Sequence, residues 1–442
     1  MNAISPSYSP QIAWGERRQP RRQVLPFLLF YVLICSPGFT NIASVNFSVA
    51  LFPIVIYGYA GAAKRTFSRL LPGARKTATL LLALILVLCG WELVTAFGAE
   101  LFVRAFRPLY GHASGLALVI AILALSGTPS DARRTRMLSM VILTIGLAAT
   151  QFIGDRGYGD RMPGLFKHPN QLGPIAAMTA LFMFCGMIAG QGRKRLWSAL
   201  SMVIAIYAIL LSGSKTALVI LAAVIFVSIV LLALLRSDIR AAATEIYRNF
   251  VLALVLVVVA GVALSITNER AYAVLTELTT SEEENVGDYR TVVARNELWE
   301  ESIDMVKLHP LAGVGAGQLM RDGKTEHSHN VFMDAMRTTG IPGLALTTAF
   351  ILAVLWYVLC AYQAARSLSK RQGSRMKEAG ARGPLVGSLM SLVLYILTNQ
   401  MSDSFGPSTI PFFYMFFAFS LTYFLPGEGL ASWGNPGELE RA

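Results

Sequence analysis

The chain has 442 residues, of which 54% are hydrophobic and 14% are charged, and its mean hydropathy is +0.54. A soluble domain carries about 25% charged residues, so this composition excludes an ordinary soluble protein. The net charge of +12 would suit nucleic acid, but the basic residues cluster in short gaps between apolar blocks, as orientation signals do in membrane proteins.

The sequence predicts an all-α polytopic membrane bundle of about twelve transmembrane helices, because its apolar blocks are roughly 17–25 residues long. The predicted spans are 24–42, 44–61, 77–99, 106–126, 137–153, 171–190, 196–212, 216–235, 249–266, 343–362, 384–401 and 408–425. Four arginines precede the first span, and we expect an uncleaved first helix rather than a signal peptide. The cysteines, which lie inside apolar blocks without C-x-x-C spacing, are interpreted as buried apolar residues. They are Cys35, Cys89, Cys185 and Cys360.

Every even-numbered gap between the predicted spans is basic, which places these gaps and both termini in the cytoplasm. The predicted organisation has five parts. They are a cytoplasmic tail (1–23), transmembrane helices one to nine (24–266), a large periplasmic loop with amphipathic helices (267–342), helices ten to twelve (343–425) and a second cytoplasmic tail (426–442). We see no internal repeat, which a transporter built from inverted halves would show.

Apolar residues at helical spacing predict an amphipathic helix over about 289–308 within the large loop, with Arg295 on its apolar stripe beside Trp299. Pro310 ends this helix, and three spaced glycines follow as a flexible turn. A short helix then begins near Asn330 and is broken by glycines from Gly340 before the next span.

His329 is the candidate catalytic residue. At the N-terminus of a helix the dipole disfavours its protonation, and a neutral histidine can act as a general base toward a hydroxyl. The alternative is an interfacial histidine that only caps the helix, and His327 is the weaker candidate. Glu326, His327 and Asp334 could contact a divalent ion, but the H-E-x-x-H spacing is absent, so no metal site is predicted.

Cations in the outward gaps oppose the orientation rule and suit phosphate binding when several converge. The alternatives for each one are snorkelling at the interface and pairing with a nearby acid. The candidates are Arg156, Arg161, Lys215, Arg290 and Arg295, with Arg104 and Arg107 at the edges. The stretch around Lys215 lacks the glycines of a nucleotide-binding phosphate loop. Inside spans three and four, Glu92 and His112 are either functional or an interior hydrogen-bonded pair.

Three motifs follow one another along the second part of the chain. They are Arg161-x-x-Gly164-x-Phe166-Lys167-His168-Pro169-Asn170, then Arg295-x-x-x-Trp299 leading to His309-Pro310-Leu311-Ala312-Gly313-Val314-Gly315, and His329-Asn330 followed after nine residues by Gly340-x-x-Gly343. In this order they resemble the O-antigen ligase and polysaccharide polymerase superfamily of membrane glycosyltransferases, which includes exopolysaccharide polymerase-like proteins. The resemblance covers most of the chain from about residue 150 onward.

The resemblance implies an enzyme of the bacterial inner membrane that needs no metal and no cofactor. Such enzymes move a glycan from a polyprenyl-pyrophosphate donor to a hydroxyl of a glycan or lipid-linked acceptor at the periplasmic face. His329 would activate the hydroxyl, and Arg161 and Arg295 would hold the pyrophosphate. Lys215 stands where the family often has arginine, so it keeps the charge without the bidentate fork.

We expect the remaining substrate-binding residues beside these, namely Arg156, Arg290, His327 and Asn330. Membrane lipids are expected partners and nucleic acid is not. The sequence does not separate ligase from polymerase, and a flippase or transporter of lipid-linked glycan is the alternative.

Overall fold

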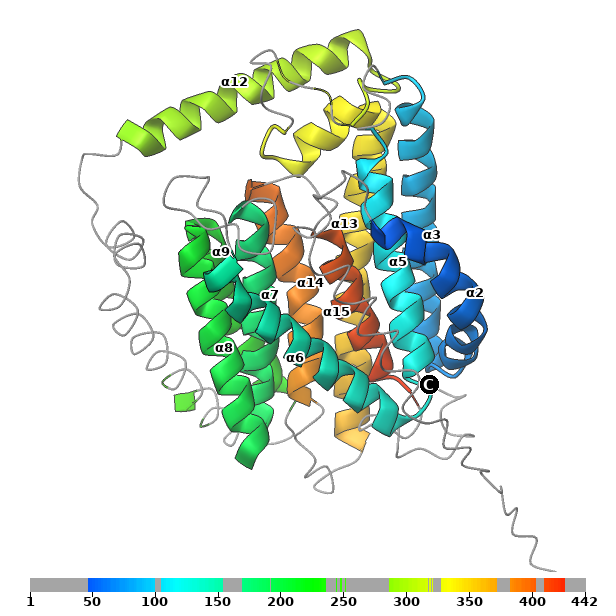
Figure 1. Cartoon of the computed structure of the whole chain (residues 1–442), viewed down its shortest axis with the longest axis vertical. Helices are drawn as coiled ribbons and strands as arrows, with labels where there is room; N and C mark the ends of the chain where they lie inside the picture. The colour runs from blue at the N-terminus through cyan, green and yellow to red at the C-terminus, as the bar shows by residue number, and fades with distance from the viewer. Residues whose placement is uncertain are drawn as a thin grey trace, which may run out of the picture.

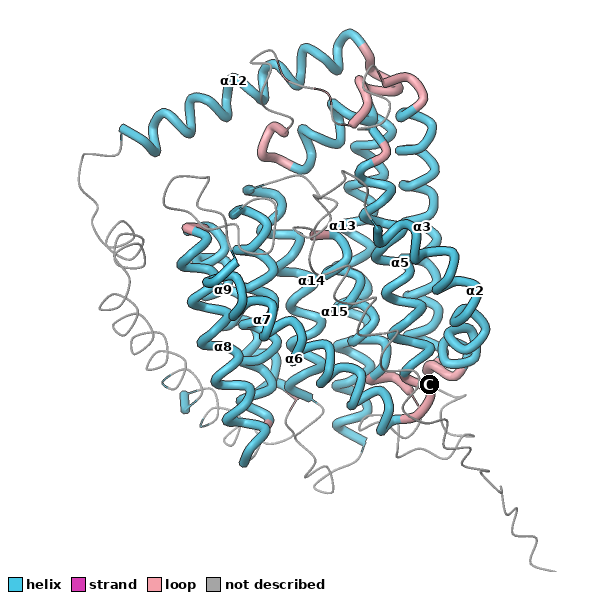
Figure 2. The backbone as a smooth tube through the Cα atoms, viewed as in Figure 1, coloured by secondary structure: helices cyan, strands magenta, loops and turns pink. Residues whose placement is uncertain are grey.

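The computed structural model describes residues 47–99, 105–153, 169–190, 192–235, 244, 247–248, 251, 286–316, 318, 320, 327–371, 382–402 and 409–425. Within these residues every regular element is a helix, as Figure 2 shows. The all-α prediction is therefore confirmed for the described part of the chain.

The helices coincide with ten of the predicted spans and with the predicted loop helix. The elements are α2 (Phe47–Ser68), α3 (Pro72–Ala96), α5 (Arg107–Leu125), α6 (Pro129–Ile153), α7 (Pro169–Ala189), α8 (Gly192–Ser212), α9 (Lys215–Leu234), α12 (Val286–Leu308), α13 (Val331–Arg371), α14 (Arg382–Ser402) and α15 (Ile410–Thr422). Predicted span 24–42 lies outside the described residues, and so does 249–266 apart from residue 251.

Six of the described helices are long and apolar enough to cross a membrane: α3, α5, α7, α8, α9 and the Val331–Ser367 part of α13. Two shorter apolar helices, Arg382–Thr398 and Ile410–Thr422, lie within α14 and α15. The protein is thus a multi-pass membrane protein by length and composition of its helices. The count of twelve spans stays a prediction.

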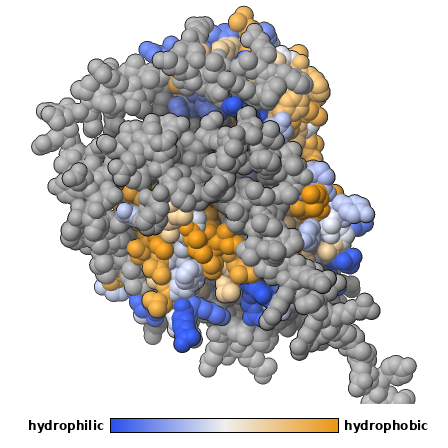
Figure 3. Space-filling view, in the orientation of Figure 1, coloured by the Kyte–Doolittle hydropathy of each residue, from blue (hydrophilic) through white to orange (hydrophobic). Residues whose placement is uncertain are grey.

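The centre of the bundle is formed by helices that are apolar all round. Every residue of α15 is buried, and its phenylalanines stack against neighbouring rings, for example Phe413 with Tyr395 at 5.4 Å between ring centroids. In contrast, the peripheral helix α3 exposes Leu80, Leu86 and Val87, as expected for a helix that faces lipid. In Figure 3 the described apolar side chains gather over the middle of the visible face, with hydrophilic ones toward its lower end.

The cysteines follow the prediction only in part. Cys185 is buried within α7, whereas Cys89 and Cys360 are only half-buried. Cys35 lies outside the described residues.

Helices α7, α8, α9, α13 and α14 run along the bundle, so their ends lie toward its two ends, whereas α6 crosses it obliquely (Figure 1). At one end the first residues of α14 contact the last turns of α7 and α9: Gly383 lies against Cys185, and Arg382 Nη1 donates to Leu235 O at 3.3 Å. Near the opposite end, the first turn of α7 lies against Ser214, just before α9. The gaps α2–α3, α5–α6, α7–α8 and α13–α14, all flanked by basic residues, lie at the first end.

The second end carries α12, which lies across the bundle above the first turns of α13 (Figure 1). Helix α13 is bent at Gly340, whose φ of 72° and ψ of −171° are not helical. The predicted break before the long span is therefore confirmed at Gly340, and the bend leaves residues 331–339 as a separate short helix beneath α12.

Candidate active site

The loop before α13 places His329 next to a capped helix N-terminus. Asn330 Oδ1 accepts hydrogen bonds from the backbone N–H groups of Phe332 at 2.9 Å and Met333 at 3.3 Å, so Asn330 is the N-cap of α13. The predicted helix start is confirmed. Asn330 thus has a structural role, and the substrate contact expected from the sequence stays a prediction.

His329 has a strained backbone. Its φ of 57° is the one positive value among non-glycine residues in the described part of the chain. A non-glycine residue in the left-handed region is held there by its surroundings, at a cost of order 1–3 kcal/mol. The half-buried His329 is therefore presented in one backbone orientation, and such strain is concentrated at functional sites.

Ser328 is the point at which this loop is fastened. Its carbonyl oxygen accepts a hydrogen bond from Trp299 Nε1 of α12 at 2.9 Å. Its N–H donates to Asp334 Oδ1 at 2.8 Å, and its hydroxyl donates to the carbonyl oxygen of Asn330 at 3.2 Å. Since Ser328 is fully buried, the residue next to His329 is fixed by both α12 and α13.

A buried ion pair, Asp334 with Arg337, lies next to the residues that hold this loop. Arg337 Nη2 lies 3.7 Å from Asp334 Oδ1 one turn away, and Arg337 Nη1 donates to the carbonyl oxygen of Gln318 at 3.1 Å. Arg337 is 0% exposed and Asp334 is 3% exposed. The sequence analysis did not single out Arg337. The spacing of an aspartate and an arginine by three residues in an apolar helix was the available signal.

The glycine turn after α12 is fastened to the bend of α13. The N–H groups of Val314 and Gly315 donate to the carbonyl oxygens of Arg337 and Thr338, both at 2.9 Å, and Ile341 N donates to Pro310 O at 2.8 Å. The turn that was predicted to be flexible is thus hydrogen-bonded to the short helix that follows His329.

Helix α12 lies at the predicted position in the sequence, but its predicted apolar face is only partly buried. Trp299 is half-buried and Val306 is buried, but Ile303 is 39% exposed. Arg290 and Arg295 lie on α12, within the part whose side chains are not described. Their approach to His329 therefore remains a prediction.

Lys215 is the first residue of α9, whose N-cap Ser214 accepts a hydrogen bond from Ala217 N at 3.4 Å. Lys215 is half-buried and lies at the end of the bundle that carries α12 and the His329 loop. Arg156 and Arg161 lie outside the described residues. The structure thus brings Lys215 and His329 to one end of the bundle, and the convergence of the four arginines is untested.

No metal-ligand group of three gathers around His327 and His329 among the described residues. Asp334, which was considered as a ligand, instead accepts from Ser328 and lies beside Arg337. Glu326 lies outside the described residues, and His327 is half-buried in the loop. The described geometry is that of a histidine between two hydrogen-bonded neighbours, Ser328 and Asn330, at one end of a membrane bundle.

Comparison with known proteins agrees with the motifs. Residues 200–348 match the family described as O-antigen ligase. The chain is also 29% identical over 212 residues to the exopolysaccharide production protein ExoQ of Rhizobium meliloti (strain 1021), an alignment that covers 44% of this chain and 46% of that protein. The chain therefore spans less than half the length of this relative.

The fold defines a polytopic helical membrane protein with a structured segment across one end of its bundle. Within that class, the two matches support an O-antigen ligase/polymerase-like superfamily, as the motifs predicted. The matched segment contains six of the predicted site residues: Lys215, Arg290, Arg295, His327, His329 and Asn330. Arg156 and Arg161 precede it.

Proposed function

We propose that the protein is a membrane glycosyltransferase that moves a glycan from a polyprenyl-pyrophosphate donor to an acceptor hydroxyl at the periplasmic face of the inner membrane. The observation that carries the proposal is the fastened His329 loop, which lies within the segment that matches the O-antigen ligase family. A histidine held in a strained backbone by two helices suits a group that must meet a substrate in one orientation.

In the proposed step the oxygen of the acceptor hydroxyl attacks the anomeric carbon of the donor glycan. The new glycosidic C–O bond forms as the bond from that carbon to the pyrophosphate oxygen breaks. His329 takes the hydroxyl proton, and polyprenyl pyrophosphate leaves with the electron pair. The reaction is balanced without an oxidant, a nucleotide or a metal ion.

Cations that face the pyrophosphate would stabilise the negative charge that develops on the leaving group. We assign this role to Arg161, Arg295 and Lys215, with Arg156 and Arg290 nearby. The position of Lys215 at the same end as His329 supports the assignment. A lysine contributes a point charge rather than a bidentate fork, so we expect the arginines to orient the donor.

The distribution of charge supports the periplasmic location. The basic gaps lie at the end of the bundle opposite to His329, and basic gaps are retained in the cytoplasm. With that orientation, the 267–342 segment and His329 face the periplasm, and both chain termini lie in the cytoplasm. In this reading the bundle has twelve spans, with 24–42 and 249–266 completing it.

The test is glycan transfer by purified protein carrying His329→Gln, which keeps a polar side chain of similar size and removes the base. We expect the transfer rate to fall by about 10²–10⁴-fold, the usual contribution of a general base. The exposed His309, at the end of α12, provides a matched control as His309→Gln. Transfer by His329→Gln at the rate of the control, with equal folded protein, would refute the general-base role.

The relative from Rhizobium meliloti is named for exopolysaccharide production, and we propose a polymerase as the first candidate and a ligase as the second. A deletion strain separates the two. Single repeat units remain attached to the acceptor if a polymerase is lost, whereas no long polymer is attached to the acceptor lipid if a ligase is lost. The alternative of a flippase predicts that the lipid-linked donor accumulates on the cytoplasmic leaflet. A transferase leaves the donor on the periplasmic leaflet.

A further inference from the structure

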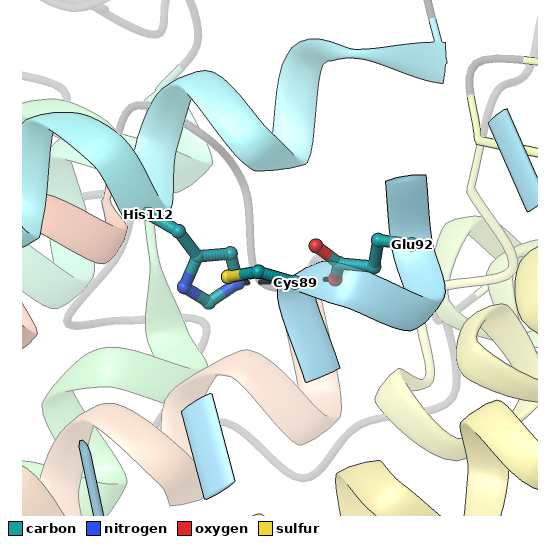
Figure 4. Close-up of side chains that lie close together, drawn as sticks. All are labelled: Cys89, Glu92 and His112. Atoms are coloured by element: carbon teal, nitrogen blue, oxygen red, sulfur yellow. Dashed lines mark ion pairs between the residues drawn. The ribbon is translucent and has the colours of Figure 1, made fainter. Parts of the chain in front are cut away.

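A group of three polar side chains inside the bundle has no part in the proposed transfer. Cys89 and Glu92 lie one turn apart on α3, and His112 lies on α5, with their side chains directed toward one another (Figure 4). One ligand atom from each lies within 4.8 Å of the other two. Among the residues that the structure describes, this is the one such group of three.

The three side chains do not satisfy one another by hydrogen bonding. His112 Nε2 lies 3.8 Å from Glu92 Oε1, beyond hydrogen-bond distance. Glu92 Oε2 is buried and has no hydrogen-bond partner in the described part of the protein. Glu92 and His112 therefore form an interior ion pair rather than a hydrogen-bonded pair, and a buried carboxylate oxygen without a donor calls for another partner.

The His112 imidazole is oriented by a residue on the side away from Glu92. His112 Nδ1 lies 2.8 Å from the hydroxyl oxygen of Tyr414 on α15. Gly115, one turn further along α5, makes room for the Tyr414 ring, because a Cβ there would overlap it. With Nδ1–H donating to Tyr414, the lone pair of Nε2 faces Glu92 and Cys89. Metal-binding histidines are commonly held by such a hydrogen bond on the second nitrogen.

We propose that Cys89, Glu92 and His112 bind a zinc ion. Sulfur, imidazole nitrogen and carboxylate oxygen are all zinc ligands, whereas calcium and magnesium take oxygen ligands. Zinc bonds of about 2.0–2.3 Å in a tetrahedron place neighbouring ligand atoms about 3.3–3.6 Å apart. The separations in the structure, up to 4.8 Å, are longer than this, so the three side chains would turn toward the ion when it binds.

The charges of this set also fit its place in the bundle. A thiolate and a carboxylate with a neutral imidazole carry a charge of −2, which a Zn²⁺ ion cancels. A neutral site is far less costly in an apolar bundle than an isolated carboxylate. Binding releases the thiol proton to solvent, and the fourth zinc position is open to water or a further ligand.

The zinc would join two helices near the candidate active site without touching the reaction. The neighbour of Glu92 on α3, Trp91, donates a hydrogen bond to the carbonyl oxygen of Thr339 at 2.8 Å, next to the bend at Gly340. Joining α3 to α5 would therefore stabilise the helix against which the first turns of α13 pack. We assign the zinc ion no part in the transfer, so the inference does not depend on the proposed function.

The test is metal binding by the full-length protein purified in detergent. After removal of metal and addition of Zn²⁺, we expect one tightly held zinc ion per chain by elemental analysis. Replacing Zn²⁺ with Co²⁺ should give a thiolate-to-cobalt charge-transfer band and the absorption of tetrahedral cobalt. No stoichiometric zinc, or cobalt without the thiolate band, would overturn the proposal.

Variants identify the ligands. Cys89→Ser and Glu92→Gln should each weaken zinc affinity by more than about tenfold, and Tyr414→Phe, which removes only the hydrogen bond to His112, by about 10–100-fold. The half-buried Cys360 provides a matched control as Cys360→Ser, which should bind zinc like the wild type. Equal affinity in Cys89→Ser and Cys360→Ser would overturn the assignment, and the wild-type cobalt spectrum decides the question if a variant fails to fold.

Discussion

The buried pair formed by Asp334 and Arg337 tests how the loop of His329 is held in place. Charges 3.7 Å apart attract by about 4 kcal/mol at an effective dielectric constant of about 20. The cost of desolvating both groups offsets part of this attraction, so we expect a coupling free energy of about 1–3 kcal/mol. Asp334→Ala should additionally slow glycan transfer, because the N–H of Ser328 loses its acceptor.

The coupling is measured by a double-mutant cycle with Asp334→Ala, Arg337→Met and the double variant, using the free energy of unfolding in detergent. Lys307 and Asp304 form the matched control, since they have the same spacing and a distance of 2.9 Å but are 70% and 48% exposed. Their coupling should stay below about 1 kcal/mol. Equal coupling in the two cycles, or additivity within about 0.5 kcal/mol for the buried pair, would refute the reasoning.

Two further variants probe the same region. Trp299→Phe keeps an aromatic side chain, although a smaller one, and removes the hydrogen bond to Ser328. It should cost about 1–3 kcal/mol of stability and lower the transfer rate. Trp356→Phe, at a side chain 58% exposed on α13, should match the wild type, and equal rates in both variants would contradict the role of this hydrogen bond. Gly340→Ala should lower the unfolding free energy by more than about 1 kcal/mol, because φ is 72° there. Gly58→Ala, at a helical glycine with open space around it, should be neutral or slightly stabilising, and equal melting temperatures would show that the bend tolerates a side chain.

The helices were largely predictable because a membrane-spanning helix needs only a long enough run of apolar residues, which the sequence shows directly. Apolar blocks gave ten helices at the expected places, but hydropathy did not locate every helix end. Helix α6 was expected from residue 137 and begins at Pro129, where Thr128 Oγ1 accepts from Asp131 N at 3.2 Å. Hydropathy locates the part of a helix that can sit in lipid, and capping residues locate its ends.

The candidate site was predictable only where its contacts are local. Asn330 caps α13 through residues two and three positions away, so the helix start could be read from the sequence. The bond from Trp299 to Ser328 joins residues 29 positions apart, and no periodicity encodes it. The Cys89–Glu92 spacing was visible as one helix face, but its meeting with His112 depends on how α3 packs against α5.

The distribution of charge links the fold to the proposed chemistry. If the arginines and lysines served only orientation, they would collect at the end of the bundle with the basic gaps. Lys215 lies instead at the opposite end, half-buried, with the strained His329 and the long helix α12. A cation at this end suits the proposed transfer, in which a membrane-anchored pyrophosphate is both the bound anion and the leaving group.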